Sequence, residues 1–116
     1  MENTLYITIN DVDYPLATTL RVAYKIQGFN NHKSYLDVFK EVEKMPVEKQ
    51  IEIVYAAFSA ANPGVMKAEA FRDFYLDNHN LKYLMQQMQA IIKGIVGDDD
   101  EDEAADAEDE ASEGNE

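Results

Sequence analysis

The chain has 116 residues, a formal net charge of −13 and no cysteine. This length allows one domain, and the lack of cysteine excludes disulfides, thiolate metal sites and a cysteine nucleophile. The charge is unevenly distributed, because residues 98–116 hold twelve of the 23 acidic residues and none of the ten basic ones. Residues 1–97 therefore carry 11 acidic and 10 basic residues, without the basic excess that nucleic-acid binding or attraction to an anionic membrane requires.

We accordingly divide the chain into a domain at residues 1–97 and an acidic tail at residues 98–116. We expect the tail to be disordered, because it has too little apolar surface to offset the entropy lost on ordering. The N-terminal sequence MENTLYITIND lacks the basic and apolar segments of a signal peptide, and no apolar run approaches the length of a membrane span. We therefore expect a cytoplasmic protein with no membrane partner.

The first predicted element is a small β-hairpin. Leu5, Ile7 and Ile9 alternate with polar or aromatic residues, a period of two that is typical of a strand. Residues 11–13 (Asp-Val-Asp) suit a turn, and residues 14–16 (Tyr-Pro-Leu) suit a short second strand. The proline keeps that strand at an edge or end, because it has no N–H to donate. A hairpin of this size must pack against other elements to be stable.

Two helices are predicted next. Thr18 or Thr19 can cap a first helix, which Gly28 ends. Ser34 can cap a second helix with Asp37 in its first turn, where an acidic side chain is favourable. The apolar side of this second helix is formed by Leu36, Phe39 and Val42.

Three further helices follow. Pro46 lies where the third would begin, a position at which its missing N–H costs nothing. Residues 62–64 (Asn-Pro-Gly) break the chain, a fourth helix covers about residues 67–77, and residues 77–80 form a hinge into the fifth. Together these elements predict a mainly α fold with a small N-terminal β-hairpin, an α+β architecture of about five helices. The apolar positions of the third and fourth helices are Val47, Ile51, Val54, Tyr55, Phe58, Phe71, Phe74 and Tyr75.

The fifth predicted helix, residues 81–97, carries a long apolar seam. Its residues follow one another at spacings of four, three, four and three, and two more widen the face. The spacing suits packing against another helix, and methionine side chains adapt to varied partners. Such residues serve either as core or as a binding surface, and we nominate them for partner binding. The apolar seam consists of Leu81, Leu84, Met85, Met88, Ile91, Ile92 and Ile95.

The acidic tail starts directly after this helix, with Asp98, Asp99, Asp100, Glu101, Asp102 and Glu103. Asp98, Asp100 and Asp102 have the spacing of a calcium loop, but the sixth position, which requires glycine, is Glu103. We therefore predict no metal site. A tail of this kind serves interaction or solubility, occupies a basic partner, or folds back on the chain's own lysines.

Candidates for catalysis are few. His32 and His79 lie in Asn-rich segments, and we interpret both as exposed loop histidines. A hydrolase that uses His79 with Asp77 is the weakest hypothesis, because no nucleophile accompanies them. The sequence contains no glycine-rich phosphate loop and no zinc-protease motif. We expect no cofactor and no enzymatic activity.

The order of elements resembles a known family. The hairpin segment LYITINDVDYPLATTL leads into a small helical domain, and FRDFYLDNHNLKYLMQQMQAIIKGIVG precedes the acidic end. This layout is similar to the tail assembly chaperones of long-tailed phages (siphophages) that infect Gram-positive bacteria. The resemblance covers Leu5 to Gly97 and rests on the pattern and order of elements, without a signature motif.

The resemblance implies a non-catalytic protein that binds the tape measure protein, keeps it soluble and helps recruit tail tube subunits. Such a protein acts in the cytoplasm of the infected host and is absent from the mature virion. Many members also exist as a longer form made by translational frameshifting, which this sequence leaves open together with homo-oligomer formation. The competing hypothesis, from another class, is an acidic decoy that occupies a basic nucleic-acid-binding protein.

Overall fold

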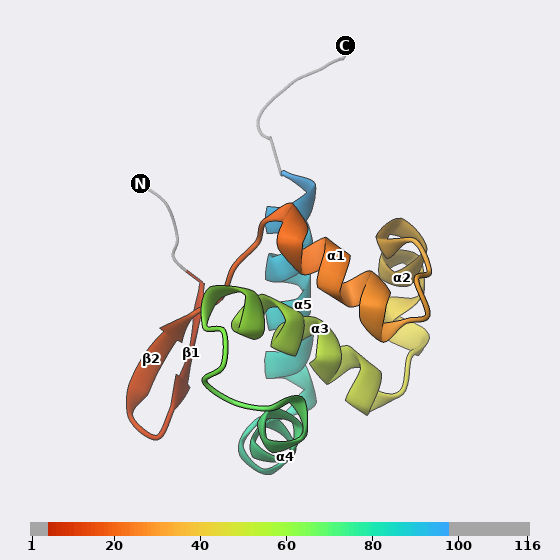
Figure 1. The fold of residues 1–116 in the computed structure, drawn as a ribbon. Coiled ribbons are helices and arrows are strands. Elements are labelled where there is room, and N and C mark those ends of the chain that lie inside the picture. The colour runs from red at the N-terminus through yellow and green to blue at the C-terminus, as the bar shows by residue number, and fades with distance from the viewer. Residues whose placement is uncertain (1–4, 98–116) are drawn as a thin grey trace.

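The computed structural model describes residues 5–97. Within that range the chain forms a two-stranded antiparallel hairpin, five α-helices and one 3₁₀ helix, η1. The predicted mainly α fold with a small N-terminal hairpin is confirmed (Figure 1). No helix of this range has the length and apolar character needed to cross a membrane. The elements are β1 (Tyr6–Ile9), β2 (Val12–Pro15), α1 (Leu20–Phe29), α2 (Tyr35–Glu41), η1 (Val42–Lys44), α3 (Val47–Ala61), α4 (Ala68–Asn78) and α5 (Leu81–Val96).

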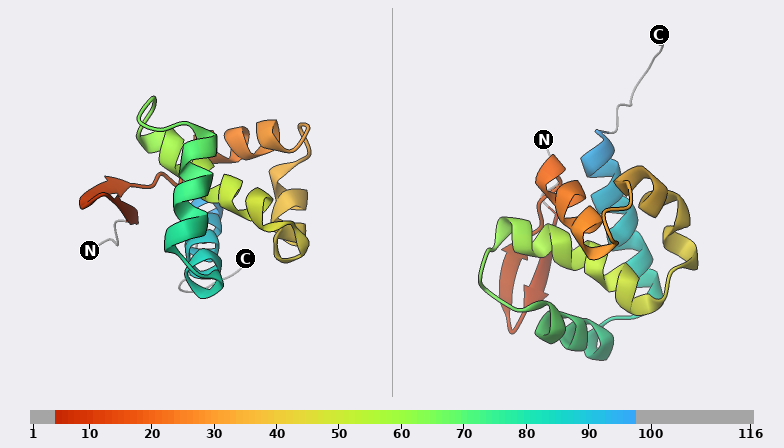
Figure 2. Two further views of the ribbon diagram at one scale, coloured as in Figure 1. Left: turned by 90° about the horizontal axis from the view of Figure 1, so that it is seen from below. Right: turned by 45° about the vertical axis from the view of Figure 1, so that its right-hand side comes forward.

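Helix α3 is the centre of the fold. Helices α1, α4 and α5 all pack against it, and β2 also contacts it (Figure 1). Its buried residues lie on more than one side of the helix, so it has no broad solvent face. The hairpin lies at one side of the molecule and α2 at the other (Figures 1 and 2). The buried residues of α3 are Gln50, Ile51, Ile53, Val54, Ala56, Ala57 and Phe58.

The hairpin turn differs from the prediction. Val12 and Asp13 belong to β2, and the turn consists of Asn10 and Asp11, which both have positive φ angles of 53° and 67°. Two consecutive left-handed residues are typical of the tight turn that matches strand twist, and Asn and Asp tolerate this conformation well. The prediction for residues 11–13 was wrong by one to two residues, because Asp-Val-Asp and Asn-Asp carry equally strong turn chemistry.

Most helix ends agree with the sequence within one or two residues. The side chain of Ser34 accepts a hydrogen bond from the N–H of Leu36, as a cap does, and α3 begins directly after Pro46. Gly28, however, does not end α1. The helix continues to Phe29, and the side chain of Asn30 donates to the carbonyl oxygen of Ile26 at 2.7 Å.

Two further boundaries are corrected. Val42, predicted within the second helix, belongs to η1 instead, since the chain must become extended at Met45 before Pro46. The hinge before α5 is shorter than residues 77–80, because α4 extends to Asn78. Asn80 then caps α5, its side chain accepting a hydrogen bond from the N–H of Tyr83 at 3.0 Å.

Two glycines in helices differ in their surroundings. A Cβ atom at Gly94 of α5 would lie 2.6 Å from the Cβ of Thr18, the residue that leads into α1, whereas a Cβ at Gly28 would have nothing within 4 Å. Gly94 therefore allows the last turns of α5 to approach the chain before α1. This close approach explains a glycine in the interior of a helix, where it is otherwise unfavourable.

We predict opposite effects of alanine at these two glycines. Gly94→Ala lowers the free energy of unfolding by about 1–2 kcal/mol, because overpacking outweighs the gain in helix propensity. Gly28→Ala raises it by about 0.5–1 kcal/mol, since only the propensity changes. Urea unfolding followed by circular dichroism measures both. Removing the Thr18 side chain (Thr18→Gly) must recover part of the loss in Gly94→Ala, and equal effects of the two alanines contradict the close approach.

Candidate functional site

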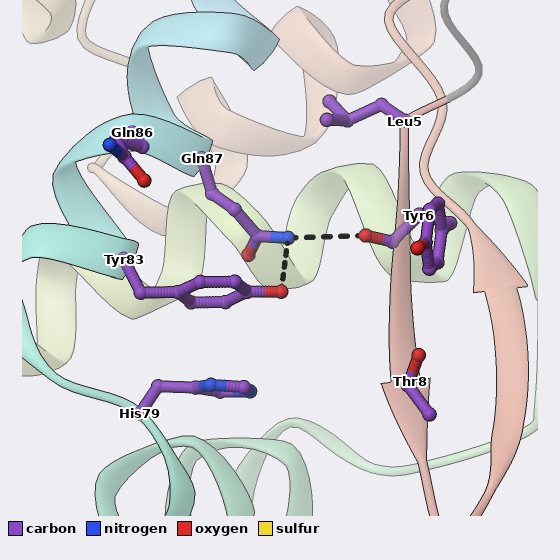
Figure 3. A pocket seen from close by; sticks show the side chains of 7 residues that line it. All are labelled: Leu5, Tyr6, Thr8, His79, Tyr83, Gln86 and Gln87. Carbon is purple, nitrogen blue, oxygen red and sulfur yellow. Dashed lines mark hydrogen bonds between the residues drawn. The ribbon is translucent and has the colours of Figure 1, made fainter.

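A buried glutamine connects three parts of the fold. Gln87 of α5 is only 5% exposed. Its Oε1 accepts a hydrogen bond from the hydroxyl of Tyr75 on α4 at 2.7 Å. Its Nε2 donates to the hydroxyl of Tyr83 at 3.1 Å and to the carbonyl oxygen of Tyr6 on β1 at 3.3 Å (Figure 3). The amide thus has partners for its oxygen and for both N–H groups, as a buried amide requires.

His79 belongs to an aromatic cluster beside this network. Its ring stacks on Tyr83, with centroids 4.1 Å apart and planes inclined by 14° (Figure 3). Tyr75 lies at 4.7 Å and Phe74 at 5.7 Å, the latter edge-on. The Nε2 atom is buried without a hydrogen-bond partner within residues 5–97. The interpretation of His79 as an exposed loop residue was therefore wrong.

Burial sets the protonation of this cluster. It lowers the pKa of His79 below the usual value, which favours the neutral imidazole. It raises the pKa of Tyr83, an effect to which nearby Tyr6 adds and which the hydrogen bond from Gln87 opposes. Burial also raises the pKa of Tyr75 far above the usual range, with Tyr83 adding to the shift. All three groups are consequently uncharged at neutral pH.

The structure does not join His79 to Asp77. Asp77 is exposed at the end of α4, and no hydrogen bond or ion pair connects the two side chains. Across the described range, residues 5–97, no group of three His, Cys, Asp or Glu side chains is placed to hold a metal ion. The acidic residues Asp98 to Glu103, including the calcium-like spacing, lie outside the described residues.

A groove opens between β1 and α5 next to this cluster. It has a volume of about 490 Å³, and no Asp, Glu, Lys or Arg lines it. Figure 3 shows Tyr83, Gln86 and Gln87 on one side of it, β1 on the other and His79 below. We call it the β1 groove; its lining residues are Leu5, Tyr6, Thr8, His79, Tyr83, Gln86 and Gln87.

The apolar seam of α5 divides between core and surface. Leu84, Met88 and Ile91 are buried and pack in the core, so in this conformation they are not accessible to a partner. Three others, Met85, Ile92 and Ile95, are half-buried, and Leu81 is 63% exposed. The buried side of α5 therefore includes Gln87, and it is rotated about the helix axis relative to the predicted apolar seam.

Leu81 contributes to a second surface feature. Together with Val47 at the start of α3 and Leu76 near the end of α4 it borders a shallow depression of about 110 Å³. Val47 is 44% exposed and Leu76 is 49% exposed. Leu81 was predicted to bind a partner, Val47 was predicted only as an apolar position of the third helix, and Leu76 was not predicted, because the three residues come together only in the tertiary fold. We call Val47, Leu76 and Leu81 the apolar patch.

The sequence has no match among protein-family models, curated proteins or solved structures.

The hydrogen bonds of Gln87 predict unequal effects of removing the two tyrosine hydroxyls. Tyr75→Phe deprives Oε1 of its donor in a buried site and lowers the free energy of unfolding by about 1–2 kcal/mol. Tyr83→Phe costs less than about 1 kcal/mol, because Nε2 keeps the carbonyl oxygen of Tyr6. Chemical unfolding of the two variants checks this order, and a larger loss for Tyr83→Phe contradicts the network.

The lowered pKa of His79 predicts a dependence of stability on pH. The folded chain binds a proton less readily than the unfolded chain, so stability is fully present above the unfolded pKa of about 6.5 and is lost as the pH falls through the folded value. The contribution of His79 to the stability of the wild type therefore falls as the pH drops below about 6.5. His79→Gln flattens this part of the curve, as thermal unfolding at several pH values will test. Equal slopes for both proteins exclude the effect.

Proposed function

We propose that this chain is a non-catalytic assembly chaperone of long-tailed phages, which binds the tape measure protein and keeps it soluble while tail tube subunits are recruited. It acts in the cytoplasm of the infected host and is absent from the mature virion. The observation that carries the proposal is the apolar patch, supported by the sequence resemblance. A holding chaperone needs such a surface, because its client is an apolar helix that must be released again.

The apolar patch suits a helical client. Its three side chains come from three different helices, so the surface is supported by the packed core beneath them. Tyr75 and Leu84 line the depression between them and are themselves buried. One apolar side chain of a client helix fills such a depression, while its neighbours contact Leu76 and Leu81. Recognition of this kind uses residues on one helix face and needs no nucleotide.

An acidic depression adjoins the apolar patch and indicates the charge expected of the client segment. It has a volume of about 340 Å³, lies between α3 and α4 and shares Ile51 with the apolar depression. Three glutamates and Arg72 line it. Arg72 lies 3.8 Å from Glu69, and Glu52 lies 3.3 Å from Lys49. Glu48 has no ion pair within residues 5–97. A client segment with a basic residue beside its apolar face therefore fits best.

The proposal assigns the acidic tail a supporting role. Its twelve acidic residues add charge of one sign to a nearly neutral domain. Such charge raises solubility and opposes self-association, which a complex with an apolar client needs. Client binding itself is assigned to the domain, which distinguishes this function from an acidic decoy for a nucleic-acid-binding protein.

Co-expression with the tape measure protein of the same phage tests the proposal. The wild-type chain is expected to shift the client into the soluble fraction. Leu81→Asp removes an apolar contact worth roughly 1.5–3 kcal/mol and so weakens the complex about tenfold or more, as pull-down of the purified proteins will show. Leu36→Asp is the matched control, because Leu36 of α2 is 51% exposed and does not line the patch.

Truncation after Gly97 separates the two functions. A chaperone lacking residues 98–116 keeps most of its client binding, whereas a decoy loses its partner entirely. A decoy also predicts that a peptide of residues 98–116 competes with DNA for that partner in a strongly salt-dependent manner. If the client stays equally insoluble with the wild-type chain, the chaperone proposal fails.

A further inference from the structure

The two strands of the hairpin present different free edges. The N–H of Leu16 donates to the carbonyl oxygen of Leu5 at 2.9 Å, and the register pairs Ile7 with Tyr14 and Ile9 with Val12. In an antiparallel pair, alternate residues point their backbone groups toward the partner strand and away from it. Leu5, Ile7 and Ile9 therefore face β2, and the residues between them face outward.

The outward edge of β1 borders the β1 groove. The carbonyl oxygen of Tyr6 receives its hydrogen bond from Gln87, which fixes the direction of this edge toward α5 (Figure 3). By the same alternation the N–H and carbonyl groups of Thr8 point to this side, beyond the reach of the Gln87 amide. The polar edge of β1 thus faces the β1 groove, and no strand of residues 5–97 pairs with this edge.

The outward edge of β2 is protected. Pro15 has no N–H to offer, and its carbonyl oxygen already accepts a hydrogen bond from the side chain of Asn62 at 2.8 Å. Asp13, the partner of Thr8 in the register, directs its backbone groups to the same edge, while its carboxylate accepts a hydrogen bond from the Thr8 hydroxyl across the two strands at 2.5 Å. Proline and charge are the usual means by which proteins block pairing at a strand edge. The β1 edge has no proline, although it belongs to the same hairpin.

The chemistry of the groove restricts what binds there. Its seven lining residues contribute amides, hydroxyls, aromatic rings and a leucine, and no Asp, Glu, Lys or Arg. A charged segment would lose hydration without gaining an ion pair. The volume of about 490 Å³ is that of a site for a ligand of modest size, enough for a few residues of one extended chain.

We propose that the β1 edge binds a short extended segment of another protein, free of charged side chains, which adds a third strand beside Thr8 in the β1 groove. Backbone hydrogen bonds to Thr8 supply the register, and alternate side chains of the segment contact Tyr83 and His79. Gln87 limits the length of the added strand, because its amide already bonds the carbonyl oxygen of Tyr6, where the strand would otherwise continue. The segment is therefore only a few residues long.

Two other occupants fit less well. The chain's own tail has twelve acidic residues among its 19, and the groove offers no cation to pair with them. A second copy would have to bring its own β1 edge, which is backed by α5, into a space bounded by α5 of the first copy (Figure 3). The inference is independent of the proposed chaperone function, since the groove shares only His79 with the depression at the apolar patch.

A titration of the full-length ¹⁵N-labelled chain tests this inference, with an acetylated and amidated hexapeptide of alternating threonine and valine as the probe. The expected result is that the amide signals of Tyr6, Thr8 and Tyr83 shift, and that hydrogen exchange at the Thr8 amide slows about tenfold at saturation. Gln86→Trp fills the groove from α5 and raises the dissociation constant about tenfold. Gln89→Trp is the matched control, because Gln89 is exposed on the same helix outside the groove, and it changes the constant less than twofold.

A second pair of variants addresses the edge itself. Thr8→Pro removes the outward N–H and abolishes the shifts. Asp13→Pro removes the corresponding N–H on β2, together with the carboxylate that accepts from the Thr8 hydroxyl, and leaves the shifts. If one of the two proline variants unfolds the hairpin, the comparison of Gln86→Trp with Gln89→Trp still tests the inference. Shifts confined to the apolar patch, equal binding by both tryptophan variants, no binding at millimolar peptide, or a concentration-dependent dimer that closes the groove each overturn the inference.

Discussion

The fold depends on the burial of α3. Its seven buried residues face α1, α4 and α5 in turn, so every other long helix is positioned by contact with this one. Ala56 and Ala57 leave room for close approach, and the carbonyl oxygen of Ala57 also accepts a hydrogen bond from the N–H of Ala17. The connection from the hairpin to α1 is thereby tied to the central helix. Within α3, large exposed side chains are found only near its start, where Val47 lies beside Leu76 and Leu81.

The hairpin and helices α4 and α5 are joined by a polar contact within an otherwise apolar interior. Gln87 joins α4, α5 and β1 through one side-chain amide, and a buried amide of this kind is stable only when each of its groups is paired. An apolar residue would fill the same volume but would not fix the direction of the β1 edge. The glutamine therefore specifies how the hairpin sits beside the helices, and with it the shape of the groove.

Much of the architecture could be predicted from the sequence. Helical periodicity and capping residues such as Ser34 and Pro46 are local signals, and they placed the helices correctly. Gly28 misled the prediction, because helix termination depends on a left-handed residue, which in this loop is supplied by Asn31 and His32 with φ angles of 56° and 64°.

The candidate sites were less predictable. The apolar pattern of α5 favoured a seam that starts at Leu81, whereas the buried line includes a glutamine that hydropathy alone assigns to solvent. The β1 groove joins residues more than 70 positions apart in the chain, which no local pattern encodes. One signal was available, since Tyr75, His79 and Tyr83 are spaced four apart and so can stack along connected helix ends.

The contact of Gly94 with Thr18 has a consequence for how charge is distributed over the molecule. It holds the final turns of α5 beside the start of α1, so residue 98 is attached at the opposite end of that helix from Leu81 (Figure 1). Sixteen helical residues separate the two points by about 24 Å. The Debye length in physiological salt is only about 8 Å. The point at which the acidic segment is attached is therefore about three Debye lengths from Leu81, so a charge at residue 98 itself has little effect on the apolar patch.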